Sequence, residues 1–196
     1  MMRSLRLACI VWLSLVCPVW AASGLQYTRV TLDQARAIVS SEEAHDTKLT
    51  ALAVLFGKFL DTDAMGRAAL GSHWSNLTPT QQKKFLASFH VLLERTYVQK
   101  LLLFDKPDFA YLGEEDIHGG ARVHTKIITR GDDFAVVYQL RPDADRWLAT
   151  GITIEDVSLT ANLGSQLDHL LSRESVEDLL DMMRRKYGRD SAADQP

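Results

Sequence analysis

Residues 121–140 read ARVHTKIITRGDDFAVVYQL, and this stretch decides the fold class. Val123, Thr125 and Ile127 alternate with His124 and Lys126, and apolar residues again occupy every second position from Phe134 to Leu140, after the turn Gly131-Asp132-Asp133. Alternation of this kind around a glycine-containing turn is typical of a β-hairpin with one buried face. The centre of the chain is therefore expected to form two antiparallel strands.

Two flanking segments extend this hairpin. Phe109–Leu112 precedes it, and Trp147–Leu159 follows the Pro142–Asp145 turn, with a bend expected near Glu155-Asp156. Neighbouring strands joined by short turns pair as a meander. The sequence thus predicts a twisted antiparallel sheet of about four strands.

Three helical stripes precede the sheet. Thr31 and Gln34 have the spacing of a capping box, which predicts that the first helix starts at Thr31. Asp61 is placed to cap the third helix, and Gly71 is placed to end it. The expected helices are Thr31–Ser40, Lys48–Leu60 and a short helix between Asp61 and Gly71.

The strongest helix start is Thr78-Pro79-Thr80-Gln81, with a capping threonine, proline at the first helical position and glutamine at the third. The helix is expected to run to about Phe104. Its apolar residues cover most of its circumference, which is typical of a helix buried on several sides. It is expected to cross the middle of the domain, either as a core helix alone or as the wall of a cavity as well.

Two helices close the chain, at Leu163–Leu171 and Val176–Tyr187. Ser175 and Asp178 are placed to cap the second, and Gly188 to stop it. Helices before and after a strand meander predict an α+β, NTF2-like fold, in which both groups of helices pack on the sheet and leave an apolar cavity. A single domain is expected over residues 22–188, followed by a disordered polar tail over residues 189–196.

The first 21 residues have the pattern of a secretory signal peptide. A basic start with Arg3 and Arg6 precedes the apolar run Leu7–Trp20, and the small residue Ala21 follows. Cleavage after residue 21 would remove Cys9 and Cys17 and leave an exported chain without disulfides or thiol chemistry.

Composition and motifs argue against several functions. A net charge of −3 with 24% charged residues does not favour nucleic-acid binding, which needs a dense basic surface. The chain lacks the Walker loop, the serine-nucleophile elbow and the zinc-protease helix motif. Glu114-Glu115-Asp116 is interpreted as an acidic turn, and the six histidines are scattered. We expect no catalytic residues, no metal site and no cofactor.

Three blocks follow one another in order. Residues 61–74, DTDAMGRAALGSHW, resemble D-x-x-x-M-A-R-x-x-L-G-x-x-W, and residues 78–97 resemble T-P-E-Q…F…F-x-x-L-L-x-x-T-Y. The third block starts at Trp147 and resembles W-K-V-Y-D-V-x-I-E-G-V-S-L, then N-Y-R-S-Q-F and a closing helix with Leu179-Leu180. It has Thr150-Gly151, Asp156 and Leu163-Gly164 in place of Tyr-Asp, Gly and Tyr-Arg. In these blocks the chain resembles the MlaC-type periplasmic phospholipid-binding family, also called the toluene-tolerance auxiliary family.

This resemblance implies a periplasmic carrier of glycerophospholipids that maintains outer-membrane lipid asymmetry. Such a carrier holds acyl chains in an apolar cavity between helices and sheet. Its expected partners are an inner-membrane ABC transporter complex with an MCE-domain subunit and an outer-membrane lipoprotein–porin complex. Three alternatives remain open at this point: a paralogue for another lipid such as a hopanoid, an NTF2-like pocket enzyme and a non-lipid envelope adaptor.

The candidate cavity residues lie on the expected inner faces of the central helix and the sheet. They are Phe89, Leu93, Tyr97, Val123, Ile127, Val136, Tyr138, Trp147, Val157 and Leu167. Arg95, Lys100 and Arg122 are candidates for contacts with a phosphate head group, since basic side chains form charge-assisted hydrogen bonds with phosphate. Ordinary core packing and solvated surface charge are the competing interpretations of these two sets.

Overall fold

The protein is described here by a computed structural model that covers residues 22–104 and 106–187. The expected signal peptide, the stop at Gly188 and the tail lie outside the described residues. The helices are α1 (Gly24–Ser40), α2 (His45–Phe59), α3 (Thr62–Leu70), the 3-10 helix η1 (Gly71–Asn76), α4 (Pro79–Leu93), the π-helix η2 (Glu94–Val98), α5 (Gln99–Leu101), α6 (Leu159–Leu171) and α7 (Val176–Tyr187). The strands are β1 (Asp108–Ile117), β2 (Gly120–Ile128), β3 (Asp133–Asp143), β4 (Arg146–Ile154) and β5 (Val157–Ser158).

The five strands form one antiparallel sheet in the order β1-β2-β3-β4-β5, which confirms the predicted α+β meander. The strand count is five instead of about four because the last predicted strand divides in two. Glu155 and Asp156 both have positive φ, 49° and 62°, and turn the chain back on itself. Val157 and Ser158 then pair with the end of β4.

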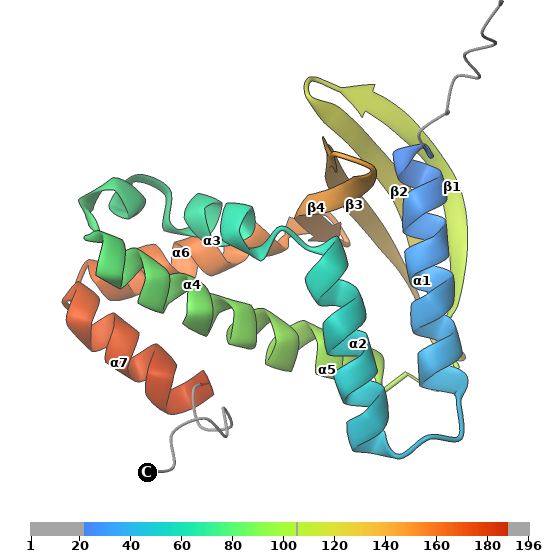
Figure 1. Ribbon diagram of the computed structural model, residues 1–196, viewed down its shortest axis with the longest axis horizontal. Helices are drawn as coiled ribbons and strands as arrows, with labels where there is room; N and C mark the ends of the chain where they lie inside the picture. The colour runs from blue at the N-terminus through green and yellow to red at the C-terminus, as the bar shows by residue number, and fades with distance from the viewer. Residues whose placement is uncertain (1–21, 105, 188–196) are drawn as a thin grey trace, which may run out of the picture.

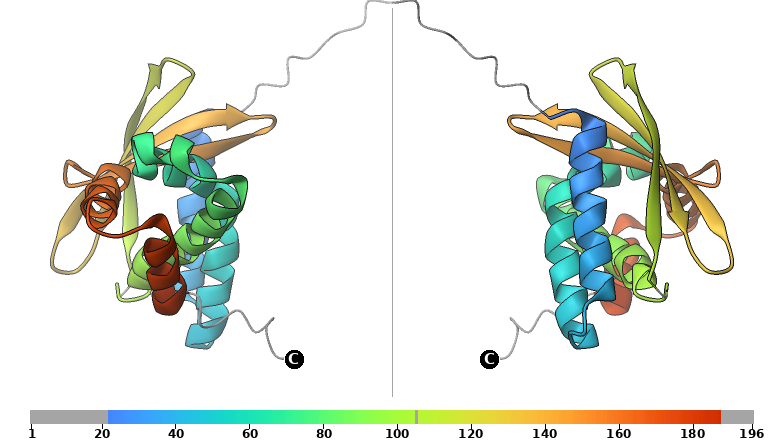
Figure 2. Two further views of the ribbon diagram at one scale, coloured as in Figure 1. Left: turned by 90° about the vertical axis from the view of Figure 1, so that its left-hand side faces the viewer. Right: turned by 90° about the vertical axis from the view of Figure 1, so that its right-hand side faces the viewer.

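Helices lie on two sides of the molecule. Figure 1 shows the sheet curving around α1 on one side, with α4, α6 and α7 together on the other. Figure 2 shows α1 and α2 lying side by side, and residues of these two helices are in contact. Helix α3 contacts α4, α6 and β4, so it connects the helical side with the sheet.

Three predicted helix starts are confirmed. Thr78 and Gln81 form a reciprocal capping box at the start of α4. Asp61 accepts a hydrogen bond from Ala64 N at 2.9 Å and caps α3. Ser175 and Asp178 bond to each other at the start of α7. In each case the cap depends on residues three apart, so the local sequence was enough to find it.

The predicted start of the first helix at Thr31 is wrong. Helix α1 begins at Gly24, and the Thr31 hydroxyl lies inside it and donates to Tyr27 O. The carboxylate of Glu114 on β1 accepts hydrogen bonds from the N–H groups of Gly24 and Leu25, at 3.2 and 2.8 Å. This distant carboxylate satisfies the exposed N–H groups of the helix end. The interpretation of residues 114–116 as a turn is also wrong, because they belong to β1.

The long central helix ends earlier than predicted and is interrupted. Helical structure runs from Pro79 to Leu101, and residues 102–104 form tight turns instead of a further helical turn. The π-helix η2 lies between α4 and α5. A π segment inserts an extra residue and changes which side of the helix faces the core.

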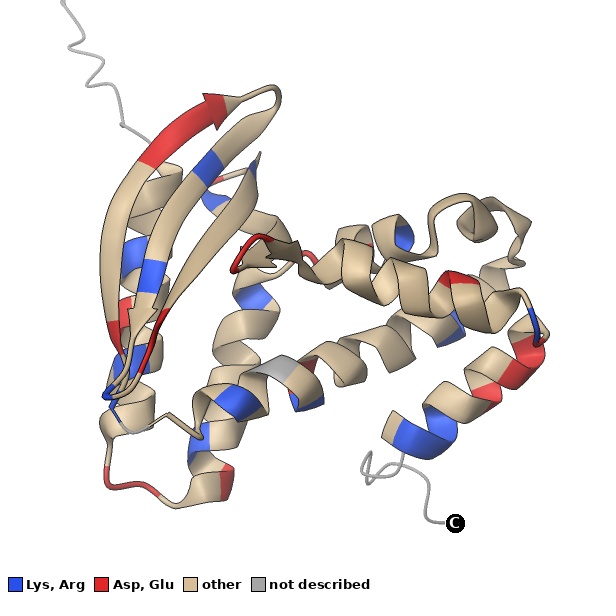
Figure 3. Cartoon of the chain, turned by 180° about the vertical axis from the view of Figure 1, so that it is seen from behind, with Lys and Arg blue, Asp and Glu red and all other residues tan. Residues whose placement is uncertain are grey.

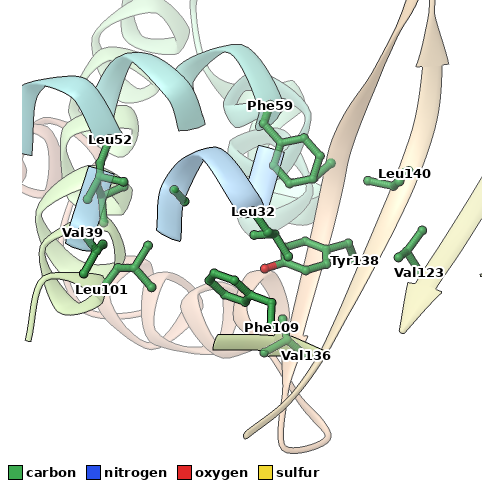
Figure 4. Packing of buried hydrophobic residues seen from close by; sticks show 13 residues of the cluster. Leu32, Val39, Leu52, Phe59, Leu101, Phe109, Val123, Val136, Tyr138 and Leu140 are labelled. Atoms are coloured by element: carbon green, nitrogen blue, oxygen red, sulfur yellow. The ribbon is translucent and has the colours of Figure 1, made fainter. Parts of the chain in front are cut away.

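Buried apolar residues form two clusters. The sheet cluster, shown in Figure 4, joins α1, α2 and the end of the long helix to the sheet. The helix cluster joins α3, α4, α6 and α7. The sheet cluster consists of Leu32, Ala35, Val39, Leu52, Phe59, Val98, Leu101, Phe109, Val123, Val136, Tyr138, Leu140 and Ala149. The helix cluster consists of Met65, Ala69, Leu70, Leu77, Phe85, Phe89, Leu93, Leu163, Leu167, Leu179, Leu180 and Met183.

The segment Leu60-Asp61 holds the two clusters together. Leu60 forms a bridge with Ala149 on β4, and Asp61 N donates to Ala149 O at 2.9 Å. The Asp61 carboxylate, while capping α3, also pairs with Arg141 of β3 at 2.7 Å. One short stretch thus attaches the start of the helical side to the two central strands.

Gly164 explains one departure from the family pattern. A Cβ at this position would lie 3.0 Å from Ala69 O, so α6 and α3 would have to move apart by a few tenths of an ångström to admit a side chain. The glycine thus suits a closer helix contact than the arginine of the family pattern would allow. Across the described residues, no helix is both long enough and apolar enough to cross a bilayer.

Candidate functional site

An apolar groove of about 370 Å³ lies between α2, the end of the long helix and the inner face of the sheet. Among its described lining residues, Lys100 is the charged one, and the others are aliphatic or aromatic. The lining consists of Phe56, Leu60, Val98, Lys100, Leu101, Phe104, Ile127, Phe134, Val136, Tyr138, Ile152, Ile154 and Leu159. The volume is at the low end of the range of about 300–1,000 Å³ for ligand pockets.

Strand periodicity builds one wall of the groove. Val136 and Tyr138 of β3, and Ile152 and Ile154 of β4, point to the same face because alternate residues of a strand share a side. The register pairs Val136 with Ile154 and Tyr138 with Ile152, so these four side chains lie next to each other. The result is a continuous apolar floor.

Helical periodicity builds the opposite wall. Phe56 and Leu60 are four residues apart, so they project from the same face at the end of α2. Val98 and Leu101 have a helical i,i+3 spacing on the long helix and add the adjoining side. Phe104 meets Phe134 of β3 with ring centroids 5.9 Å apart, which joins the end of the long helix to the sheet.

The groove has little polarity. The Tyr138 ring packs on Phe59 at a centroid distance of 5.6 Å, and burial raises the pKa of the Tyr138 hydroxyl, which stays neutral at physiological pH. Lys100 can lay its hydrocarbon stem along the apolar wall while its ammonium group reaches the edge. This arrangement suits a hydrocarbon chain with an anionic end.

Four of the thirteen predicted site residues line this groove. Ile127, Val136 and Tyr138 come from the predicted cavity set, and Lys100 comes from the predicted head-group set. Val123 is buried in the sheet cluster but does not belong to the groove lining.

Three predicted cavity residues lie elsewhere. Phe89, Leu93 and Leu167 are buried in the helix cluster. The prediction expected the long helix to be buried on several sides but assigned these residues to the same cavity as the sheet residues. The π-helix η2 separates the part that packs on α3, α6 and α7 from the part that reaches the sheet, so these residues face a different core.

The remaining predictions are also separated from the groove lining. Trp147 is partly buried at the start of β4, and its Nε1 donates to Ala22 O at 2.8 Å. Val157 is 53% exposed on the short strand β5. Arg122 pairs with Glu115 across the first two strands. Arg95 lies on η2 and is not a lining residue, and the Tyr97 side chain lies outside the described part of the chain.

The prediction missed most of the groove. Phe56 and Leu60 belonged to a recognised helical stripe, and Ile152 and Ile154 alternate in the third strand, so periodicity could have identified them. Phe104 and Leu159 lie at segment ends, where no pattern shows which way a side chain points. The missed residues are Phe56, Leu60, Val98, Leu101, Phe104, Phe134, Ile152, Ile154 and Leu159.

A second, smaller apolar cavity of about 110 Å³ lies among α4, α6 and α7. Leu167, Met182 and Met183 are among its lining residues.

Within residues 22–104 and 106–187, no group of three or more His, Cys, Asp or Glu side chains is placed to hold a metal ion. Figure 3 shows the basic and acidic residues distributed over helices and strands on both sides of the molecule, with the acidic stretch of β1 near one end of the sheet.

The model of the MlaC protein family matches residues 29–185. The chain belongs to the MlaC family. This match covers most of the chain and confirms the predicted resemblance. A comparison with curated protein sequences finds no match.

A solved structure shares the fold of this MlaC-family chain. It is a phospholipid-binding protein from Ralstonia solanacearum in complex with a phospholipid, with a TM-score of 0.73 and 21% sequence identity. The alignment covers 85% of the present chain and 98% of the Ralstonia chain. The likeness confirms the arrangement of helices on a curved antiparallel sheet.

Proposed function

We propose that this MlaC-family protein is a carrier that binds a phospholipid with the hydrocarbon in the groove between α2 and the sheet. The observation that carries the proposal is the apolar lining of this groove, in which Lys100 is the charged residue among those described. The phospholipid bound to the Ralstonia solanacearum protein of the same fold supports it. Lys100 would lie near the phosphate.

The physics of lipid transfer favours an enclosed site. Moving one methylene group from water into an apolar site is worth about 0.8 kcal/mol. A bilayer already gives the lipid this stabilisation, so a carrier must shield most of the chain or lose it to the membrane. A groove with aromatic and aliphatic walls on three elements can provide that shielding, whereas a flat surface cannot.

The cellular role follows from the family and the leader-like start of the chain. We propose export to the periplasm, with residues 1–21 as a cleaved signal peptide. There the protein would exchange phospholipid between an inner-membrane MCE/ABC transporter complex and an outer-membrane lipoprotein–porin complex. A role in outer-membrane lipid asymmetry follows from such exchange.

The groove lining favours binding over catalysis. General acid–base chemistry needs a positioned carboxylate, histidine or similar group whose pKa suits proton transfer. The groove instead offers hydrocarbon, one lysine and a phenol whose pKa is raised by burial. A pocket enzyme is therefore the weaker candidate, and a hopanoid carrier would use the same apolar surface without needing Lys100.

Organic extraction of the purified protein followed by mass spectrometry tests the proposal. We expect phospholipid in stoichiometric amount, or its uptake from liposomes by protein prepared lipid-free. A hopanoid in the extract would redirect the proposal to another lipid. A clean extract together with no uptake would contradict the carrier function.

A further inference from the structure

We propose that the smaller cavity, among α4, α6 and α7, is a second binding site, which takes a short hydrocarbon chain with an anionic end, such as a short-chain carboxylate. The cavity belongs to the helical side of the molecule (Figure 1), and within the described part of the chain it shares no lining residue with the groove. The inference therefore does not depend on phospholipid binding in the groove.

The inner part of the cavity is apolar on all three helices. Phe89 comes from α4, Leu163 and Leu167 come from α6, and Leu179 and Met183 come from α7. The two residues of α6 are four apart, as are the two of α7, so each pair projects from one face of its helix. All five side chains are buried. A hydrocarbon that enters this space leaves water behind, which is favourable.

The size of the cavity selects a short chain. Its volume is about 110 Å³. An engineered apolar cavity of about 150 Å³ in another protein stays dry and binds one benzene molecule. In proportion, the present cavity accommodates about four or five carbons. Because the cavity opens to the surface, the end group of the ligand can remain in water.

The opening carries a positive charge. Lys186 is the charged residue among the described lining residues, and Gln166 and Tyr187 are the polar ones. Lys186 and Gln166 are exposed, so they lie at the rim and not in the apolar interior. The Lys186 Nζ atom lies 5.4 Å from the centroid of the Tyr187 ring. The end group of a bound chain therefore meets an ammonium group where it reaches water.

The rest of the helix end has the same sign. The last turn of α7 carries Arg184, Arg185 and Lys186, while the acidic residues of the first turn lie at the opposite end of the helix. Asp181 pairs with Arg184 at 3.2 Å, which leaves an excess of positive charge in this turn. A carboxylate at the opening is attracted and an ammonium group is repelled. The two clues together specify a short anionic amphiphile.

Three small ligands test the proposal. Hexanoate and pentylammonium each place five methyl or methylene carbons behind a charged end, with opposite signs, and benzene has no charge. The full-length protein, labelled with ¹³C at the methionine methyl groups, is titrated with each at neutral pH and followed by NMR. Met182 and Met183 line the cavity, whereas Met65 is buried in the same cluster outside the lining and serves as the internal control.

We expect saturable shifts of the Met182 and Met183 methyl signals with hexanoate and little change at Met65. The dissociation constant of pentylammonium should be higher by at least about fivefold, because the attraction of a surface ion pair is replaced by repulsion. Equal or tighter binding of pentylammonium overturns the anionic ligand class. Shifts with benzene alone overturn it as well, and no shift with any of the three overturns the site.

The variant Lys186→Gln tests the rim charge. It should weaken hexanoate by about threefold and leave benzene unchanged. Arg185→Gln is the matched control, since Arg185 is the exposed neighbour in the same turn and is not a lining residue. If both variants weaken hexanoate equally, or neither does, Lys186 does not hold the anionic end and this assignment is wrong.

A titration of protein already loaded with phospholipid separates the two sites. The hexanoate shifts of Met182 and Met183 should be unchanged, because the groove and the smaller cavity have separate linings. Loss of these shifts on loading would mean that hexanoate acts from the groove, which overturns the inference. The titration of lipid-free protein gives a result even if the groove binds no phospholipid, so the two proposals can fail independently.

Discussion

The sheet cluster and the helix cluster are both built from leucine and aromatic residues, yet they pack differently. In the helix cluster, Gly66 and Gly164 let neighbouring helices approach closely: a Cβ on Gly66 would lie 2.9 Å from Leu86. In the sheet cluster, the end of α2 meets the sheet through large side chains and leaves about 370 Å³ of apolar space. Small residues let two helices pack closely and leave little space between them. Bulky residues on a helix that faces a curved sheet hold the two apart and leave room for a ligand.

Truncating a phenylalanine in each region should give the largest contrast. Phe89→Ala in the helix cluster, where the Phe89 side chain is fully buried beside the smaller cavity, should lower the free energy of unfolding by about 3–5 kcal/mol. Phe134→Ala at the groove should cost clearly less, about 1 kcal/mol, because its ring already borders open space. Urea denaturation of lipid-free protein measures both. Equal losses would contradict the division into a closed and an open region.

Filling the groove should abolish binding while keeping the fold. Val136 is 1% exposed and forms part of the groove floor, so Val136→Trp places an indole in the ligand space. We expect a cost of about 1–3 kcal/mol from overpacking and a fall in bound lipid of at least tenfold, measured by extraction and mass spectrometry.

Val157→Trp is the matched control for this variant, since Val157 is exposed on β5 outside the groove lining. It should leave lipid content unchanged. If Val136→Trp remains folded with its full lipid content, the groove is not the binding site.

Removing the Asp61 contacts that connect the helix cluster with the sheet should have a smaller effect on stability. The side chain of Asp61 is 12% exposed, caps α3 and pairs with Arg141, so Asp61→Ala should cost about 1–2 kcal/mol. Asp143→Ala removes a more exposed partner of the same arginine and should cost at most a few tenths of a kcal/mol. Thermal unfolding compares the two, and equal values would show that Asp61 does not anchor α3.

The smallest effect is expected at the outer edge of the sheet. The pKa of Asp108 is lowered by the hydrogen bond from Phe109 N–H and by Arg36, with N–O distances of 2.9 and 2.6 Å. A lowered folded-state pKa stabilises the fold above the unfolded value of about 4, and this contribution is lost as pH falls through the folded value. Asp108→Asn should therefore lose slightly less stability than the parent between pH 6 and pH 3. An identical pH profile of the denaturation midpoint would refute this contribution.

Local signals predicted most elements, and non-local contacts explain part of the errors. Thr78-Pro79-Thr80-Gln81 and Asp61 predicted helix starts because the capping groups lie within one turn. The start of α1 was missed although it has a local cap: the Ser23 hydroxyl accepts a hydrogen bond from Gln26 N at 3.2 Å. The carboxylate of Glu114, 90 residues away from Gly24, adds a contact that no local pattern shows. The candidate site was predicted in part: alternation identified Ile127, Val136 and Tyr138, but nothing in the sequence showed that the long helix divides between two cores.

The sequence by itself determined the fold class, the strand meander, several helix caps and membership of the MlaC family, because these depend on periodicity and on residues close together in the chain. Only the tertiary structure decided where the buried apolar side chains leave a groove between them. That outcome depends on how closely each helix can approach its neighbour, as Gly164 against Ala69 and Phe56 beside the sheet show in opposite ways. Hydrophobicity drives both sets of side chains inward, and the shapes that meet there determine whether a gap remains.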